Sequence, residues 1–123
     1  MPAKTPDDVN KLLIESINNG DVDSALALYE ENAAFVTGEG TAIGHEAIRG
    51  VLEAFVATKP NLTMEPKETV ETGDVAITRG VWNLDGTGPD GEPIKMSGRS
   101  MEVVRRQADG NWLFAIDHPN GAD

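Results

Sequence analysis

Cysteine is absent from the 123 residues, which excludes a disulfide framework, a thiolate nucleophile and a zinc–thiolate site. Long apolar runs are absent too, and because no run approaches 18 residues, we expect no membrane-spanning helix. The first residues, MPAKTPDD, lack the apolar segment of a secretory signal. Together these absences lead us to expect a cytoplasmic protein that does not engage membranes.

Basic residues are scarce: 10 Lys and Arg face 21 Asp and Glu, for a net charge of −11. Such a surface repels phosphate backbones, so we expect no nucleic-acid partner. It also repels anionic ligands unless a local basic group captures them. The two histidines have no HExxH context, and residues 85–92 lack the alternating acids of a calcium loop. We therefore predict no metal site and no cofactor.

The first half of the sequence shows helical spacing. Thr5-Pro6-Asp7-Asp8 is typical of a helix start, because the hydroxyl can cap free N–H groups, proline fits the first turn and acids favour the positive end of the dipole. Asn18-Asn19-Gly20 ends this helix. A second helix after Asp21 would share one apolar face, comprising Val22, Ala25, Leu26 and Tyr29. A short strand at 33–37 and a third helix at 45–56 follow.

The second half alternates with the period of strands, and we expect them at 62–71, 75–84 and 94–106, with a final one from Trp112. Pro66 implies an edge strand or a bulge. Turns are expected at 72–74 and 108–110, and a long loop at 85–91. This order predicts one α+β domain over residues 1–123, with three N-terminal helices packed on one face of a curved, mostly antiparallel sheet.

The final strand, in the stretch NWLFAIDHPNG, holds an adjacent acid and imidazole, Asp117 and His118. Neighbouring strand residues point to opposite faces. Regular alternation puts His118 on the bulkier face with Trp112, Phe114 and Ile116, and Asp117 on the other. His118 could then serve as a general acid or base. Alternatively it caps the sheet end while Asp117 pairs with a basic residue, or Pro119 ends the regular strand and lets both reach a rim.

Two more charged residues are candidates. If Glu102 faces a cavity with Ser100 and Val104, desolvation would raise its pKa unless Arg79 or Arg106 neutralises it; if it faces solvent, it is a cross-strand salt-bridge partner. Arg79 is either held by an acid or clamps a ligand carboxylate.

Several strings, in this order and spacing, resemble the NTF2-like superfamily, specifically its SnoaL-like and ketosteroid-isomerase-like (DUF4440-type) branch. The strings that carry this resemblance are Asn19-Gly20-Asp21, Ala27-Leu28-Tyr29, Ala34-Phe35-Val36, residues 44–49, residues 73–82, Arg105-Arg106-Gln107 and Trp112 through His118. The resemblance covers nearly the whole chain. It implies a cone-shaped sheet around a pocket for an apolar small molecule, and a homodimer formed through the outer face of the sheet.

The resemblance supplies no complete catalytic set. Where ketosteroid isomerase carries its base and its tyrosine, this sequence has Thr37 and Leu13, although Glu102 stands at the position of the oxyanion-hole acid. The limonene-epoxide-hydrolase-like group uses an Asp-Arg-Asp arrangement, which Arg79 and Asp117 match while Val81 replaces the second acid.

Two functions remain open at this point. The first is a pocket protein acting as a cofactor-free lyase, isomerase or hydrolase, with His118, Asp117 and Glu102 as catalytic residues and Arg79, Trp112, Phe114 and Tyr29 as ligand-binding residues. The second is a non-catalytic dimeric binding or assembly module. Beside these two, an association domain of the kind fused to a kinase in relatives is a third possibility.

Overall fold

The computed structural model describes residues 2–123 and contains three helices and six strands in that range. In chain order they are α1 (Pro6–Asn18), α2 (Val22–Leu26), β1 (Tyr29–Thr37), β2 (Gly40–Ile43), α3 (His45–Ala57), β3 (Asn61–Thr72), β4 (Val75–Thr87), β5 (Pro93–Arg106) and β6 (Trp112–His118). The strands form one sheet in the order β2-β1-β6-β5-β4-β3. All neighbouring strands are antiparallel except β1 and β6, which run parallel.

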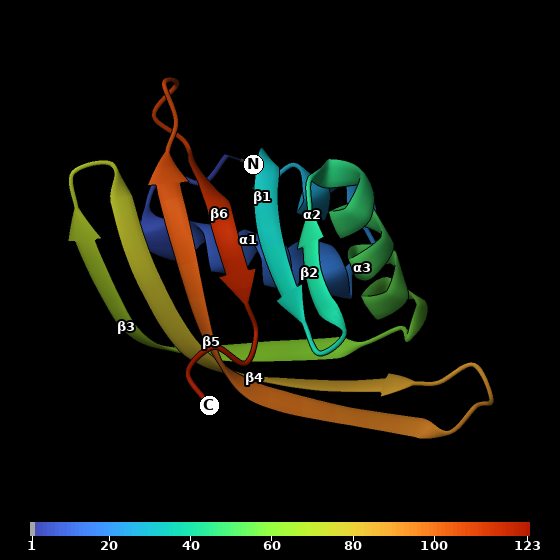
Figure 1. Ribbon diagram of the computed structural model, residues 1–123. Coiled ribbons are helices and arrows are strands. Elements are labelled where there is room, and N and C mark those ends of the chain that lie inside the picture. The colour runs from blue at the N-terminus through green and yellow to red at the C-terminus, as the bar shows by residue number, and fades with distance from the viewer. Residues whose placement is uncertain (1) are drawn as a thin grey trace.

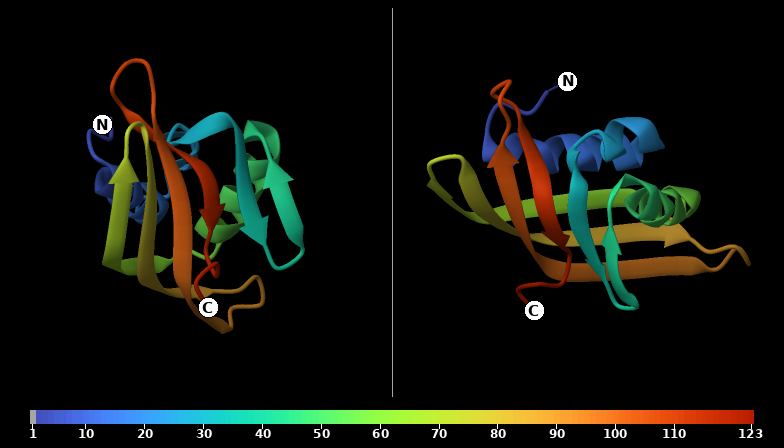
Figure 2. Two further views of the ribbon diagram at one scale, coloured as in Figure 1. Left: turned by 60° about the vertical axis from the view of Figure 1, so that its left-hand side comes forward. Right: turned by 45° about the horizontal axis from the view of Figure 1, so that its top comes forward.

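The sheet is strongly curved and the helices lie on its concave side (Figure 1). Strands β4 and β5 bend along their length. One half of the pair continues the sheet beside β6, with β5 next to β6, and the other half forms an arm below α3 (Figures 1 and 2). The predicted α+β architecture with helices on one face of a curved sheet is therefore confirmed. None of the helices within residues 2–123 is long and apolar enough to cross a membrane.

Helix α1 begins as its sequence predicts. The Thr5 hydroxyl accepts a hydrogen bond from the Asp8 N–H at 3.3 Å, and the Asp8 carboxylate accepts one from the Thr5 N–H at 3.2 Å, which completes a capping box. At the other end, the Asn18 side chain bonds both backbone groups of Leu62, at 2.9 and 2.7 Å. These bonds anchor the end of α1 to the start of β3 and fix the helix across the concave face.

Two details of the first half differ from the prediction. Tyr29 does not share a helical face with Leu26, because α2 ends there and Tyr29 begins β1. The Leu28 carbonyl accepts from the Phe114 N–H of β6 at 2.8 Å, so strand pairing overrides the helical spacing. The strand expected at 33–37 is followed by a hairpin that was not predicted: Gly38 and Glu39 form its turn, and Gly40 begins β2.

Strand β3 confirms the expectation for Pro66. It is an edge strand, and its pairing with β4 shifts register between Pro66 and Glu68. Both features avoid the hydrogen bond that proline cannot donate. Strands β4 and β5 extend beyond the predicted ends, which shortens the expected loop at 85–91 to residues 88–92.

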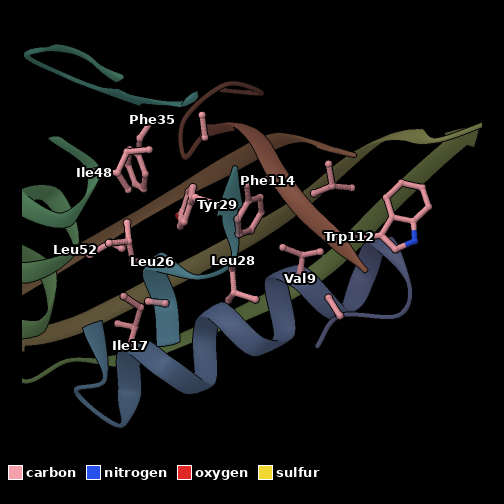
Figure 3. Close-up of a cluster of buried hydrophobic side chains, with 14 of the residues drawn as sticks. Val9, Ile17, Leu26, Leu28, Tyr29, Phe35, Ile48, Leu52, Trp112 and Phe114 are labelled. Atoms are coloured by element: carbon pink, nitrogen blue, oxygen red, sulfur yellow. The ribbon is translucent and has the colours of Figure 1, made fainter. Parts of the chain in front are cut away.

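The apolar core fills the space between α1 and the sheet (Figure 3). At its centre the Tyr29 and Phe114 rings lie 4.8 Å apart between centroids, and Val9 of α1 is fully buried in the same cluster. The core continues toward α3 through Phe35, Ile48 and Leu52. The cavity described below opens beside this cluster.

Candidate functional site

A cavity of about 70 Å³ lies between the helices and the concave face of the sheet. It is lined by Asn10, Leu13, Ile14, Ile17, Tyr29, Phe35, Leu52, Phe55, Leu62, Met64, Trp82, Leu84, Ser100, Glu102, Asp117 and Pro119. Most of these side chains are apolar. The polar ones come from α1 and from the adjacent strands β1, β5 and β6, so the cavity combines apolar walls with one polar end.

A β-bulge decides which residues of β6 reach this cavity. Val104 pairs with Phe114 and Val103 pairs with Ile116, so Ala115 is an extra residue in β6. The bulge reverses the alternation beyond it: Ile116 is 42% exposed, whereas Asp117 is only 4% exposed. The prediction that Ile116 and His118 share the face of Trp112 and Phe114 is therefore wrong, because regular alternation does not pass through a bulge.

Glu102 and Asp117 form a carboxyl pair at the polar end of the cavity. They are cross-strand partners in the β5–β6 pairing, and Glu102 is 2% exposed. The Tyr29 hydroxyl donates to Asp117 Oδ2 at 2.6 Å. Glu102 Oε1 accepts from the Thr78 hydroxyl at 2.7 Å and from Asn10 Nδ2 at 3.2 Å. Each acid is therefore held by neutral donors on a different set of elements.

Burial dominates the protonation of the pair. The pKa of Asp117 is raised to about 8, first by burial and second by the nearby charge of Glu102, while the Tyr29 hydrogen bond opposes both. Burial also raises the pKa of Glu102, against the opposing effect of hydrogen bonds from Ser100, Thr78 and Asn10. Tyr29 itself has a pKa well above its ordinary value because it is buried beside these acids. At neutral pH the Asp117 carboxyl is therefore mostly protonated.

Among residues 2–123, no Lys, Arg or His side chain lines the cavity. Arg79 is exposed and pairs with Glu68, so the structure does not bring it to the acids. Arg106, the other base considered as a partner of Glu102, is exposed and pairs with Asp74. The expectation that an acid holds Arg79 is met by Glu68.

The remaining candidates lie outside the cavity wall. His118 follows Asp117 and belongs to the opposite face, opposite Met101 in the β5–β6 pairing. Its Nδ1 is the one fully enclosed side-chain N or O atom without a hydrogen-bond partner in the described part of the chain. Trp112 and Phe114 are buried core residues that do not line the cavity. Of the seven candidates, the structure brings together Tyr29, Glu102 and Asp117.

Two polar residues of the site were missed by sequence reasoning. Asn10 belongs to the same stripe of α1 as Leu13, Ile14 and Ile17, and all four line the cavity. A polar residue inside an apolar helical stripe is the signal that could have identified it. Thr78 is 2% exposed and bonds both Asn10, at 3.1 Å, and Glu102, but a threonine in a strand gives no such signal.

The arrangement can supply an acid and a base within one apolar site. A neutral carboxyl group donates a hydrogen bond or a proton, and an adjacent carboxylate accepts one. Within residues 2–123, no three His, Asp or Glu side chains lie close enough together to hold a metal ion.

Comparisons with solved structures support the fold. The chain is similar to a ketosteroid isomerase-like protein from Erwinia carotovora atroseptica, with a TM-score of 0.80, 21% identity and coverage of 90% of this chain and 88% of that one. It is also similar to an NTF2-like superfamily protein from Salmonella enterica serovar Typhimurium, with a TM-score of 0.81, 17% identity and coverage of 94% of this chain and 89% of that one. A third similar structure is a Xanthomonas campestris protein assigned to the calcium/calmodulin-dependent protein kinase II association domains. Its TM-score is 0.75, its identity is 19%, and the match covers 95% of this chain and 91% of that one.

A search of the curated proteins found no match. The sequence itself matches the SnoaL-like domain over residues 11–114. This range contains most of α1, all of α2, α3 and β1 to β5, and the start of β6 up to Phe114. The matched range includes Tyr29 and Glu102 of the site. The chain therefore belongs to the SnoaL-like domain family.

Proposed function

We propose that this chain binds a small, mainly apolar molecule in the cavity and that the Glu102–Asp117 pair transfers a proton to or from it without a cofactor. The observation that carries this proposal is the burial of two carboxyl groups in an apolar cavity whose lining, within residues 2–123, has no basic side chain. Burying acids without a counterion costs free energy, and groups of shifted pKa concentrate at functional sites. Membership of a family of small-molecule-binding domains supports the same conclusion.

The two acids divide the chemistry between them. Asp117, protonated at neutral pH, would donate to an oxygen of the ligand, as a neutral carboxylic acid does in an oxyanion hole. Glu102, with donors on Oε1, would act as the proton acceptor through Oε2. Tyr29 would position Asp117 through its hydroxyl. A carbonyl compound that gains and loses a proton beside the carbonyl group is the reaction class that fits these roles.

The test uses cyclopentanone as a probe, with ¹H NMR following exchange of its α-protons in D₂O at neutral pH. We expect the protein to accelerate exchange over buffer, and both Glu102→Gln and Asp117→Asn to remove the acceleration. Glu68→Gln is the matched control, because Glu68 pairs with Arg79 on the exposed surface. No acceleration by the native protein would contradict the catalytic part. Native mass spectrometry of freshly purified protein would show whether a ligand is bound all the same.

An assembly function has its own supporting observation. One row of apolar residues crosses the outer face of all six strands, comprising Val70, Ile77, Val103, Ile116, Ala34 and Ile43. Four of them are large and at least 42% exposed. A continuous exposed apolar surface is typical of an interface, and we propose that a second copy of the chain covers it.

Light scattering tests this homodimer. The native chain should have the mass of a dimer at tens of micromolar, and Ile77→Asp, at the centre of the row, should have the mass of a monomer. A monomeric native chain at that concentration would contradict the proposal.

A further inference from the structure

The carboxyl pair leaves one oxygen of each acid open to the cavity. Both hydrogen bonds to Glu102 fall on Oε1, and the Tyr29 bond to Asp117 falls on Oδ2. Apart from the Ser100 hydroxyl, which also lowers the pKa of Glu102, no hydrogen-bond donor within residues 2–123 is left for Glu102 Oε2 or Asp117 Oδ1. Neither is among the fully enclosed atoms without a partner, so each keeps accessible surface. Two adjacent strands thus present two acceptor oxygens at the polar end of one cavity.

The charge around these oxygens is of one sign. The titratable group that faces the pair from another strand is Tyr29, and its neighbours from α1 and β4, Asn10 and Thr78, are neutral. The chain as a whole carries −11. An anionic ligand would meet repulsion from the protein surface and from the pair, whereas a cation would be attracted by both. A cation would also supply the counterion that the lining lacks.

We infer that the cavity also binds a second class of ligand, a compact apolar molecule with a protonated amine whose ammonium group bridges Glu102 Oε2 and Asp117 Oδ1. The inference rests on the pocket of the proposed function and goes beyond it, because the ammonium group takes the place of the proton that Asp117 would donate to a carbonyl oxygen, so that the amine competes with the substrate for the pocket. An ammonium group has three N–H donors and no acceptor, which matches two unpartnered acceptor oxygens on cross-strand neighbours. Ser100 is another polar residue of the lining, and its hydroxyl oxygen is an acceptor for the third N–H.

The walls select the body of the ligand. Leu13, Phe55, Met64, Trp82 and Leu84 are among the apolar residues around the space, which favours a hydrocarbon body over a bare metal ion or a polyamine. The volume of about 70 Å³ is roughly half that of a cavity of about 150 Å³ that holds benzene. A body smaller than benzene, such as a short branched chain or a small ring, therefore suits the space.

Proton linkage gives the inference a distinctive signature. The ammonium group takes the place of the proton that Asp117 carries at neutral pH, so binding releases a proton. Affinity should rise with pH up to about 8, by up to about tenfold per pH unit, because the competing proton is lost from Asp117 over that range. A neutral ligand bound to the protonated pair would show no such rise.

The experiment compares three probes of one shape: cyclopentylamine, cyclopentanol and cyclopentanecarboxylate. Binding is followed at pH 6, 7 and 8 by ¹⁵N NMR, with the Trp82 indole N–H as a reporter, because Trp82 lines the cavity and its Nε1 donates to the Pro119 carbonyl at 2.7 Å. At pH 8 we expect the amine to bind at least tenfold more tightly than the alcohol, and the carboxylate not to bind. Glu102→Gln and Asp117→Asn should each weaken the amine at least tenfold, and Glu68→Gln should not.

Three outcomes would overturn the inference. If the alcohol binds as tightly as the amine, the positive charge does not contribute to binding and the cavity takes a neutral ligand. The proposed function would then still stand. Amine binding that is unchanged in both Glu102→Gln and Asp117→Asn places it outside the cavity. Absence of binding by amine and alcohol alike overturns the inference and the proposed pocket function together. Circular dichroism of each variant confirms that it is folded, and either acid variant alone is sufficient to test the bridge.

Discussion

Two adjacent rows of side chains cross the sheet, one on each face, and they reverse the usual distribution of polarity. The outer row is the apolar series from Val70 to Ile43 described above. The inner row, displaced by one residue, comprises Thr69, Thr78, Glu102, Asp117, Phe35 and Ala42. The two acids at its centre are buried, whereas Ile77 and Ile116 on the other face are 43% and 42% exposed.

Each face departs from what stability alone would favour. Exposed isoleucines forgo the free energy of burial, and buried acids bear a desolvation penalty. A departure on one face could be incidental, but both occur at the same place in the sheet. The difference supports the two proposals made above, a ligand site on the inner face and an interface on the outer face.

The largest contrast is expected within β6. Phe114→Ala should lower the free energy of unfolding by about 3–5 kcal/mol, because Phe114 is fully buried and packs against Tyr29. Ile116→Ala should change it by no more than about 0.5 kcal/mol in a monomer, because Ile116 lies on the outer face. Urea denaturation measures both. A large loss for Ile116→Ala in a monomeric protein would contradict the placement of Ile116 on an exposed outer face. A loss that grows with protein concentration would support the proposal that a second copy of the chain covers this face.

The pH dependence of stability tests the inner row. The pKa of Asp117 in the folded chain, about 8, lies above its ordinary value of 3.8, so the folded state binds the proton more tightly than the unfolded state does. This contribution to stability is fully present below about pH 4 and is lost as pH rises to about 8, by up to about 1.4 kcal/mol per pH unit.

Asp117→Asn should remove this dependence. The variant should match the native protein near pH 4 and exceed it in stability at pH 8.5, as measured by urea denaturation across that range. Equal slopes for the two proteins between pH 5 and 8 would show that Asp117 is not protonated in the folded state.

Tyr29→Phe should have a smaller effect. It removes the donor to Asp117 Oδ2, which costs about 1–3 kcal/mol when a buried acceptor is left unpaired. It should also raise the pKa of Asp117, because the hydroxyl favours the charged form. The ¹³C shift of the Asp117 carboxyl carbon reports the titration directly. An unchanged midpoint would mean that the hydroxyl does not bond the carboxylate in solution.

The smallest effect is expected at the ion pair between Arg79 and Glu68. Both side chains are about half exposed, so Arg79→Ala should cost at most about 1 kcal/mol, and the loss should shrink in high salt. Thermal unfolding at low and high salt measures it. A loss of ligand affinity in this variant would contradict the separation of Arg79 from the cavity.

Local signals in the sequence predicted much of the fold and part of the site. Thr5 and Asp8 identify the start of α1, and Pro66 identifies an edge with a bulge, because each effect arises within a few residues. Tyr29 and β2 were misassigned because pairing with distant strands decides them. The sequence left open whether Glu102 faces the cavity or the solvent, because alternation shows which residues share a face but not which face of the sheet is buried.

The orientation of Asp117 and His118 could not be predicted for a different reason. The bulge at Ala115 is stabilised by the alignment of β6 with β5 and β1 together, and neither partner strand is visible in the local pattern. Asp117 pairs with Phe35 on one side and Glu102 on the other, so its direction depends on two strands that are remote in sequence. Any rule based on period two fails at such a position.

The bulge also means that the seven residues of β6 encode two alternative cavities. With Ala115 absorbed as an extra residue, the cavity contains two carboxyl groups. With every residue of β6 in regular alternation from Phe114, Ile116 would pair with Glu102, His118 would pair with Ser100 on the same inner face, and Asp117 would face outward. A slip of one residue would thus replace the second acid of the inner face by an isoleucine and bring an imidazole to that face, without any substitution. On this fold, an insertion or a deletion near the end of β6 would therefore change which side chains face the cavity as directly as a point mutation does.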